Sequence, residues 1–202
     1  MTRNLTDTSF ATYFNTQFGT QFGTQFGTAP HVQTQTQTRT ATVFRDTRDP
    51  LQARYDIDRK LPRDLRDEAE GMDWGLFMAT YAPAPTFHVA ITDASAQSWL
   101  NTHFRLATTA LPKTATPHTS IEEVTASGPV GAITEVLHRY GRFVEMLSFH
   151  QIELYEATIT CVKVQHQTNE NRRAWAIGFH SDPSHSVAAA LSSAAQRIHG
   201  NF

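Results

Sequence analysis

Three residues of types used in catalysis lie close together near the C-terminal end of the chain. His180, Asp182 and Ser184 are separated by single residues, and His185 follows directly. These types form hydrolytic triads, in which a serine attacks, a histidine takes its proton and an aspartate orients the histidine. Triad members normally converge from separate segments, however, and Asp and Ser are also common N-cap residues of helices. The spacing therefore favours a helix start at Asp182 over a catalytic centre.

The other residues that could bind a metal or act on a substrate are scattered along the chain. The ten histidines and one cysteine form no Cys-x-x-Cys, His-Glu-x-x-His or His-x-His motif, and no glycine-rich phosphate loop occurs. Glu122 and Glu123 are neighbours on a predicted strand, where successive side chains point to opposite faces. We therefore predict no metal site, no cofactor and no catalytic residue.

Two predicted helix starts remain as candidate binding sites. Ser127-Gly128-Pro129 opens one helix and Asp182-Pro183-Ser184 opens the other. Ser, Gly and Asp suit the N-cap position, and Pro suits the first turn. The free N–H groups and the dipole of a helix start attract anions, including carboxylates. Small residues from Ala126 to Gly128 would let a ligand approach the backbone, although they fit a tight strand-to-helix turn without a ligand equally well.

The elements that position these helix starts follow from hydrophobic periodicity. Alternating apolar residues and turn signals predict two groups of three strands, each closed by a one-faced helix. Because no helix separates most strands, the sheets should be antiparallel, which gives an α+β fold of two βββα units. The predicted strands are 87–91, 100–106, 121–125, 144–152, 157–165 and 173–179, with turns at 93–97 and 169–171, a loop at 112–117, and helices at 129–140 and 183–198.

Composition divides the chain into three segments. Residues 1–45 are of low complexity, with Thr16-Gln17-Phe18-Gly19 repeated twice more in succession, and lack the aliphatic surface that a core needs. We predict that this segment is a disordered tail. Residues 46–85 are expected to form a linker subdomain with short helices after Pro62 and over 74–81. Residues 86–202 form the βββα domain.

Charge and hydropathy narrow the classes of partner. The formal net charge is −2 at pH 7, which gives no electrostatic reason to expect nucleic acid. The sequence contains no run of eighteen apolar residues and no secretory signal pattern, so we predict no membrane contact and a cytoplasmic location. Cys161 is the only cysteine, which excludes an internal disulfide.

Several motifs resemble those of 2-isopropylmalate synthases, in the same order along the chain. Leu61-Pro62-Arg63-Asp64-Leu65 resembles the Leu-Pro-Arg-x-Leu of their linker subdomain, and 74–81 resembles the Trp-x-Leu-Phe-x-x-x-Tyr that follows it. Residues 127–132 are similar to the Asn-Gly-Pro-x-x-Ala of their C-terminal regulatory domain. Residues 175–179 match its Trp-Gly-Val-Gly-Ile strand, and 190–197 resemble its Ala-x-x-Ser-Ala-x-Asn-Arg helix.

The resemblance implies a homodimeric regulatory domain that binds leucine or a related metabolite near the two helices, in the setting of branched-chain amino acid biosynthesis. The matching effector-binding positions are Ala126, Ser127, Gly128, Pro129, Gly131, Gly178, His180, Asp182 and Ser184. The synthases catalyse their reaction on a metal-containing (β/α)8 barrel of about 250 residues. Only the low-complexity segment precedes residue 45, so we expect a stand-alone regulatory homologue that is not an enzyme.

Three functions therefore stay open at the level of sequence. The chain could be a sensor that binds a small amino acid or 2-oxo acid itself. It could instead be a ligand-free dimerisation partner of a full-length synthase. A third hypothesis is a new enzyme at the dimer cleft that uses a residue such as His180 or Glu123.

Overall fold

The computed structural model describes residues 48–200, and the predicted disordered tail (1–45) lies outside them. The elements in chain order are α1 (Pro50–Tyr55), α2 (Arg63–Glu68), α3 (Trp74–Tyr81), β1 (Phe87–Ala96), β2 (Thr102–Ala110), β3 (His118–Ala126), α4 (Pro129–Arg139), β4 (Val144–Glu153), β5 (Thr158–His166), β6 (Asn169–His180) and α5 (Pro183–His199). This order confirms the predicted strand-strand-strand-helix pattern and its repetition.

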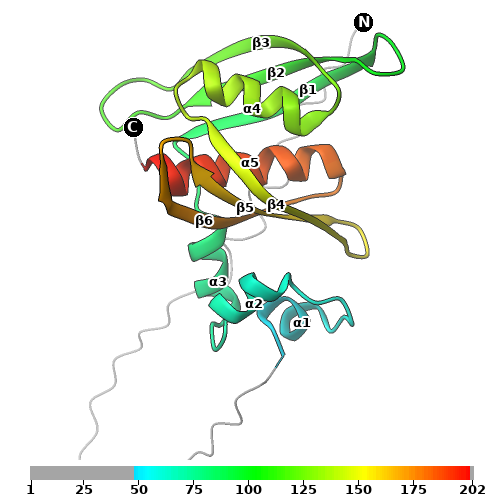
Figure 1. Cartoon of the computed structure of the whole chain (residues 1–202), viewed down its shortest axis with the longest axis vertical. Helices are drawn as coiled ribbons and strands as arrows, with labels where there is room; N and C mark the ends of the chain where they lie inside the picture. The colour runs from blue at the N-terminus through cyan, green and yellow to red at the C-terminus, as the bar shows by residue number, and fades with distance from the viewer. Residues whose placement is uncertain (1–47, 201–202) are drawn as a thin grey trace, which may run out of the picture. The chain divides into compact units, whose positions relative to one another are not determined.

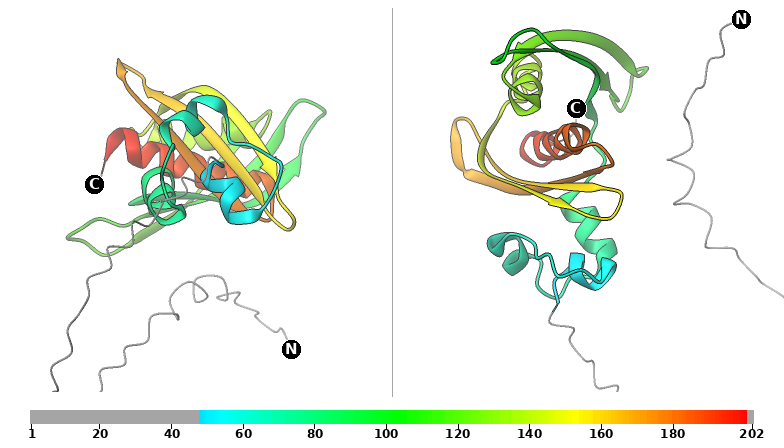
Figure 2. Two further views of the ribbon diagram at one scale, coloured as in Figure 1. Left: turned by 90° about the horizontal axis from the view of Figure 1, so that it is seen from below. Right: turned by 90° about the vertical axis from the view of Figure 1, so that its right-hand side faces the viewer.

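The strands form two separate antiparallel sheets, as predicted for an α+β fold. Sheet A has the order β1-β2-β3, sheet B has the order β4-β5-β6, and each is followed by its helix (Figure 1). In the right-hand view of Figure 2, α4 and α5 lie between the two sheets. The fold is therefore a sandwich with a sheet on each outside and the helix pair in the middle.

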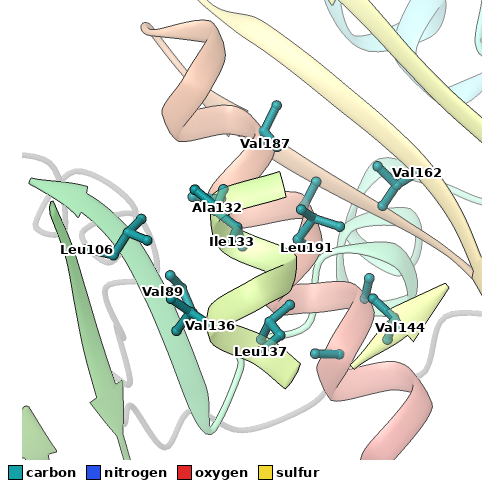
Figure 3. Close-up of a cluster of buried hydrophobic side chains, with 14 of the residues drawn as sticks. Val89, Leu106, Ala132, Ile133, Val136, Leu137, Val144, Val162, Val187 and Leu191 are labelled. Carbon is teal, nitrogen blue, oxygen red and sulfur yellow. The ribbon is translucent and has the colours of Figure 1, made fainter. Parts of the chain in front are cut away.

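The apolar stripes of the two helices meet in one core between the sheets. Ile133 and Leu137 of α4 and Val187 and Leu191 of α5 are all buried there, together with Val89 and Leu106 of sheet A and Val162 of sheet B (Figure 3). Tyr140, the last residue of the helix predicted over 129–140, lies at the surface, where its ring packs on Phe87 with 4.7 Å between the ring centroids. The predicted helix face is thus correct except at its C-terminal end.

A second core lies on the other face of sheet B, and the helices of the predicted linker build it. Phe77 and Tyr81 of α3 pack with Trp175 and Ile177 of β6 on that face. Helices after Pro62 and over 74–81 were predicted and are present as α2 and α3, whereas α1 was not predicted. The Asp49 carboxylate caps α1 by accepting the N–H of Gln52 at 2.8 Å. The sequence signal for α1 that was missed is therefore the N-cap Asp49 followed by Pro50 in the first turn.

Two predicted turns are displaced in the structure. Residues 93–97 were expected to form a turn, but β1 continues to Ala96 and the turn lies at 97–101, because a β-bulge between Ile91 and Asp93 interrupts the alternation of side chains. The turn expected at 169–171 lies at Gln167 and Thr168, between the paired residues His166 and Asn169. Both errors concern boundaries and leave the strand count unchanged.

The backbones of β6 and α5 approach each other closely at Gly178. A Cβ at Gly178 would overlap the backbone of Ser186 and Ala190 in α5, which is rigid and buried. We expect Gly178→Ala to lower the free energy of unfolding by about 3 kcal/mol, measured by urea denaturation. Gly131→Ala is the control, because its Cβ would meet only the Ala126 Cβ at 3.5 Å. The control should raise stability by about 0.5–1 kcal/mol, and equal losses in both variants would contradict the packing argument.

Candidate functional site

The two predicted helix starts lie at the same end of the fold. Ala126 at the end of β3 is paired with Thr102, and His180 at the end of β6 is paired with Thr158. Figure 3 shows the first turns of α4 and α5, marked by Ala132 and Val187, at the same end of the helix pair. The structure therefore brings the two halves of the predicted site to one end of the molecule, where they differ sharply in chemistry.

The start of α5 is closed by its own side chains. The Asp182 carboxylate accepts hydrogen bonds from the backbone N–H groups of Ser184 at 2.8 Å and His185 at 3.0 Å. Its Oδ1 also lies 2.9 Å from Nδ1 of His185, whose Nε2 is 2.9 Å from the carbonyl oxygen of Ile91 in sheet A. The hydrogen bond with the His185 side chain lowers the pKa of Asp182, and the two backbone N–H groups add to this. An internal anion already occupies the site that a ligand carboxylate would use.

His180 serves the same closed end. Its Nδ1 accepts the backbone N–H of Asp182 at 3.0 Å, and its ring stacks on that of His185 with centroids 4.6 Å apart. Burial lowers the pKa of His180, and the charge of the neighbouring His185 lowers it further. His180 is therefore neutral near pH 7 and holds the turn before α5, so the three predicted residues of this cluster form a helix cap and no triad.

Gly178 does not belong to a ligand-accessible surface. The space above its Cα is filled by the backbone of α5. Its lack of a side chain is thus explained by the approach of helix and strand, which is a recognised reason for glycine within a strand. None of the positions predicted around α5 lines the groove at the start of α4 that is described below.

The start of α4 is open. Gly128 is the N-cap and has no side chain to accept a hydrogen bond from the first turn, and Pro129 follows at the first helical position. A groove of about 410 Å³ lies beside it, between β3 and α4. The residues that line this groove are Glu123, Val124, Thr125, Ala126, Ser127, Gly131, Glu135 and Arg139. Three predicted effector positions, Ala126, Ser127 and Gly131, are therefore brought together in one groove.

Charged side chains on α4 and β3 form the far part of this groove. The Arg139 guanidinium contacts Glu135 at 3.3 Å and Glu122 at 3.1 Å, and the Tyr140 hydroxyl donates to Glu122 at 2.8 Å. Glu123 points to the opposite face of β3, as predicted, and lies 3.7 Å from Arg105. Sequence reasoning missed Glu135 and Arg139, although their spacing of four and eight residues from Gly131 places them on one helix face.

The two helix starts differ because equivalent positions carry different residues. Each helix has proline at its first position, Pro129 in α4 and Pro183 in α5. Counting from these prolines, Gly128 stands where α5 has Asp182, and Gly131 stands where α5 has His185. The side chains that close α5 are thus replaced by glycine in α4, and one of these glycines, Gly131, lines the groove.

Other groups offer little reactive chemistry. Within residues 48–200, no cluster of three or more His, Cys, Asp or Glu side chains could hold a metal ion. Burial raises the pKa of the Cys161 thiol to about 12, so it is not a thiolate near neutral pH. In the same range, the structure contains no helix of the length and apolarity needed to cross a membrane.

The cap of α5 generates a prediction with a defined pH dependence. Asp182→Ala should lower stability by about 1 kcal/mol at pH 7, because two N–H groups lose their acceptor. The folded state lowers the pKa of Asp182, so its contribution is present above the ordinary carboxyl pKa of 3.8 and is lost as the pH falls through the lower folded value. Urea denaturation at several pH values should therefore show wild type and variant converging in acid. Asp182→Asn, which keeps a cap acceptor, is the control, and a difference that grows in acid would contradict the assignment.

Comparison with known proteins leaves the family open: no protein-family model matches the chain, and no curated protein is significantly similar to it.

Proposed function

We propose that this chain is a regulatory-type domain that binds a small amino acid at the start of α4. The observation that carries the proposal is the contrast between the two helix starts. Asp182 closes α5, whereas Gly128 leaves α4 without a side-chain cap beside a groove lined by Ala126, Ser127 and Gly131. The resemblance to the regulatory domain of 2-isopropylmalate synthase supports a leucine-like effector, a homodimer, a cytoplasmic location and a role in branched-chain amino acid biosynthesis.

The groove has complementary chemistry for both ends of an amino acid. N–H groups and the helix dipole at the start of α4 suit the α-carboxylate. Glu135, on the groove wall, suits an ammonium group. Arg139 is held by Glu122 and Glu135, which leaves it less available to a second carboxylate. These charges favour an amino acid over the corresponding 2-oxo acid, which lacks the ammonium group.

The contacts of the residues proposed for catalysis support binding instead. His180 is held by the backbone of Asp182 and by stacking on His185. Glu123 is paired with Arg105 at 3.7 Å and lies 3.9 Å from His103. The ligand-free alternative, a dimerisation partner of a full-length synthase, is favoured by one observation: Trp99 is 91% exposed, as expected of an anchor for another protein.

A thermal-shift measurement with a matched pair of variants tests the proposal. A ligand that binds only the folded state stabilises it by about 2.7 kcal/mol at a hundred times its Kd. We expect L-leucine or a similar aliphatic amino acid to raise the Tm of wild type, with a smaller shift from the 2-oxo acid. Gly128→Asp places a carboxylate where α5 has Asp182, and no atom lies within 4 Å of its Cβ position. This variant should fold normally and lose the shift.

Ser184→Ala is the control, because α5 is closed by Asp182 and Ser184 contributes only its backbone N–H there. It should retain the full ligand-induced shift. If no amino acid or 2-oxo acid stabilises wild type, the sensor proposal fails and the ligand-free dimerisation partner becomes the better account. If Gly128→Asp binds as tightly as wild type, the ligand does not use the start of α4.

A further inference from the structure

Polar side chains of α5 bond the free edge of β1. β1 is an edge strand of sheet A, so the backbone groups on its outer side have no strand partner in the described part of the chain. The Ser192 hydroxyl accepts the N–H of Val89 at 3.1 Å, and Gln196 accepts the N–H just before the strand at 2.9 Å. Farther along β1, Nε2 of His185 lies 2.9 Å from the carbonyl oxygen of Ile91. α5 therefore covers this edge where a further strand would otherwise pair.

The two oxygen atoms that His185 contacts can only accept hydrogen bonds. Its Nδ1 lies 2.9 Å from the Asp182 carboxylate, and its Nε2 lies 2.9 Å from the backbone carbonyl of Ile91. A neutral imidazole has one N–H donor and one acceptor nitrogen, whereas an imidazolium has two donors. In either neutral tautomer, one ring nitrogen would direct its lone pair at an oxygen lone pair. Both contacts are therefore hydrogen bonds only when both ring nitrogens carry a proton.

The groups around the ring favour this charged form. Within residues 48–200, the ionisable side chains that interact with the His185 ring are Asp182 and His180. The pKa of Asp182 is lowered, first by its hydrogen bond with the His185 side chain, so it supplies a negative charge in direct contact. The pKa of His180 is also lowered, chiefly by burial, so its stacked ring is neutral and adds no repulsion. The positive end of the α5 dipole opposes a charge here, and the Asp182 carboxylate offsets it.

We propose that His185 is an imidazolium in the folded protein and acts as a pH-sensitive clamp between the start of α5 and the free edge of sheet A. Of the three α5 side chains that bond this edge, only the histidine changes its charge near neutral pH. His185 does not line the groove at the start of α4. The clamp is therefore independent of the amino acid proposed to bind there.

Loss of one proton from His185 releases sheet A and keeps the cap of α5. The remaining proton stays on Nδ1, because a hydrogen bond to the ionised Asp182 carboxylate is stronger than one to a neutral carbonyl. Nε2 then presents a lone pair to the Ile91 carbonyl oxygen, beside the β-bulge of β1. The protonated ring thus stabilises the fold on the acid side, and this contribution is lost as the pH rises and the ring loses its proton. In stronger acid the contribution of Asp182 is lost in turn, as the pH falls through its lowered pKa.

A variant that keeps only the contact with Asp182 tests the clamp by urea denaturation at two pH values. In His185→Asn the amide nitrogen stands in for Nδ1, and no donor faces Ile91. At about pH 6, the folding equilibrium constant of wild type should exceed that of the variant by about tenfold, the lower end for a hydrogen bond to a charged group, because the ring is 37% exposed. At about pH 9, wild type also lacks this bond, and the ratio should fall to about twofold or less.

His150→Gln is the matched control. His150 is another exposed histidine, with Nε2 2.9 Å from the hydroxyl oxygen of Ser148. A hydroxyl can donate or accept, so this contact requires no charge on the ring. The ratio between wild type and the control should therefore be the same at both pH values.

NMR of the histidine ring nitrogens in wild type gives a second readout that a folding defect of a variant would not mimic. Both ring nitrogens of His185 should still carry protons at a pH at which His150 has lost one. Two results would each overturn the inference: a His185 that loses its proton together with His150, or a ratio of wild type to His185→Asn that does not change with pH. Neither result would remove amino acid binding at α4, which the Gly128→Asp comparison decides separately.

Discussion

The fold depends on the burial of α5 between the two sheets. Most of this helix is buried, and its contact with β6 is so close that only glycine fits at position 178. Ser and Ala dominate the buried positions, since larger side chains would hold the sheets apart. The hydroxyl groups that this composition buries are paired: Ser186 with Thr160 at 2.5 Å, and Ser192 with the N–H of Val89 at 3.1 Å. α5 therefore joins sheet A to sheet B through polar contacts as well as apolar ones.

The two units differ in how the N–H groups of their helix starts are bonded. The start of α5 is at the surface, with Asp182 exposed, yet its first N–H groups are bonded within the protein. Asp182 supplies the acceptor, and His185 extends the same cluster to Ile91 in sheet A. α4 lies nearer the surface, with Gly131, Glu135 and Arg139 exposed along one side. The N–H groups of its first turn can donate hydrogen bonds to solvent or to a ligand. The missing side-chain cap therefore costs the folded state little stability.

The sequence was sufficient for the order of strands and long helices, and it pointed to three of the residues that line the groove, Ala126, Ser127 and Gly131. Periodicity and N-cap residues predicted both sheets and both long helices, because each of these signals is local. The bulge at Ile91 was not predictable from alternation alone, since one inserted residue shifts the pattern. Gly178 was assigned to an effector site through the resemblance to the synthase regulatory domain, and only the packed structure shows that the backbone of α5 fills the space above it. Glu135 and Arg139 were missed because their role in the groove depends on how α4 packs against β3, which local patterns do not specify.

The two neighbouring carboxylates of β3 have different roles because they point to opposite faces of sheet A. Glu122 accepts hydrogen bonds from Arg139 and Tyr140 and so ties the C-terminal end of α4 to the sheet. Glu123 contacts Arg105 at 3.7 Å on the outer face, and both side chains of this pair are more than half accessible. Such exposed pairs contribute at most about 1 kcal/mol. The position of α4 against sheet A, and with it the shape of the groove, therefore depends on the bonds of Glu122 and not on Glu123.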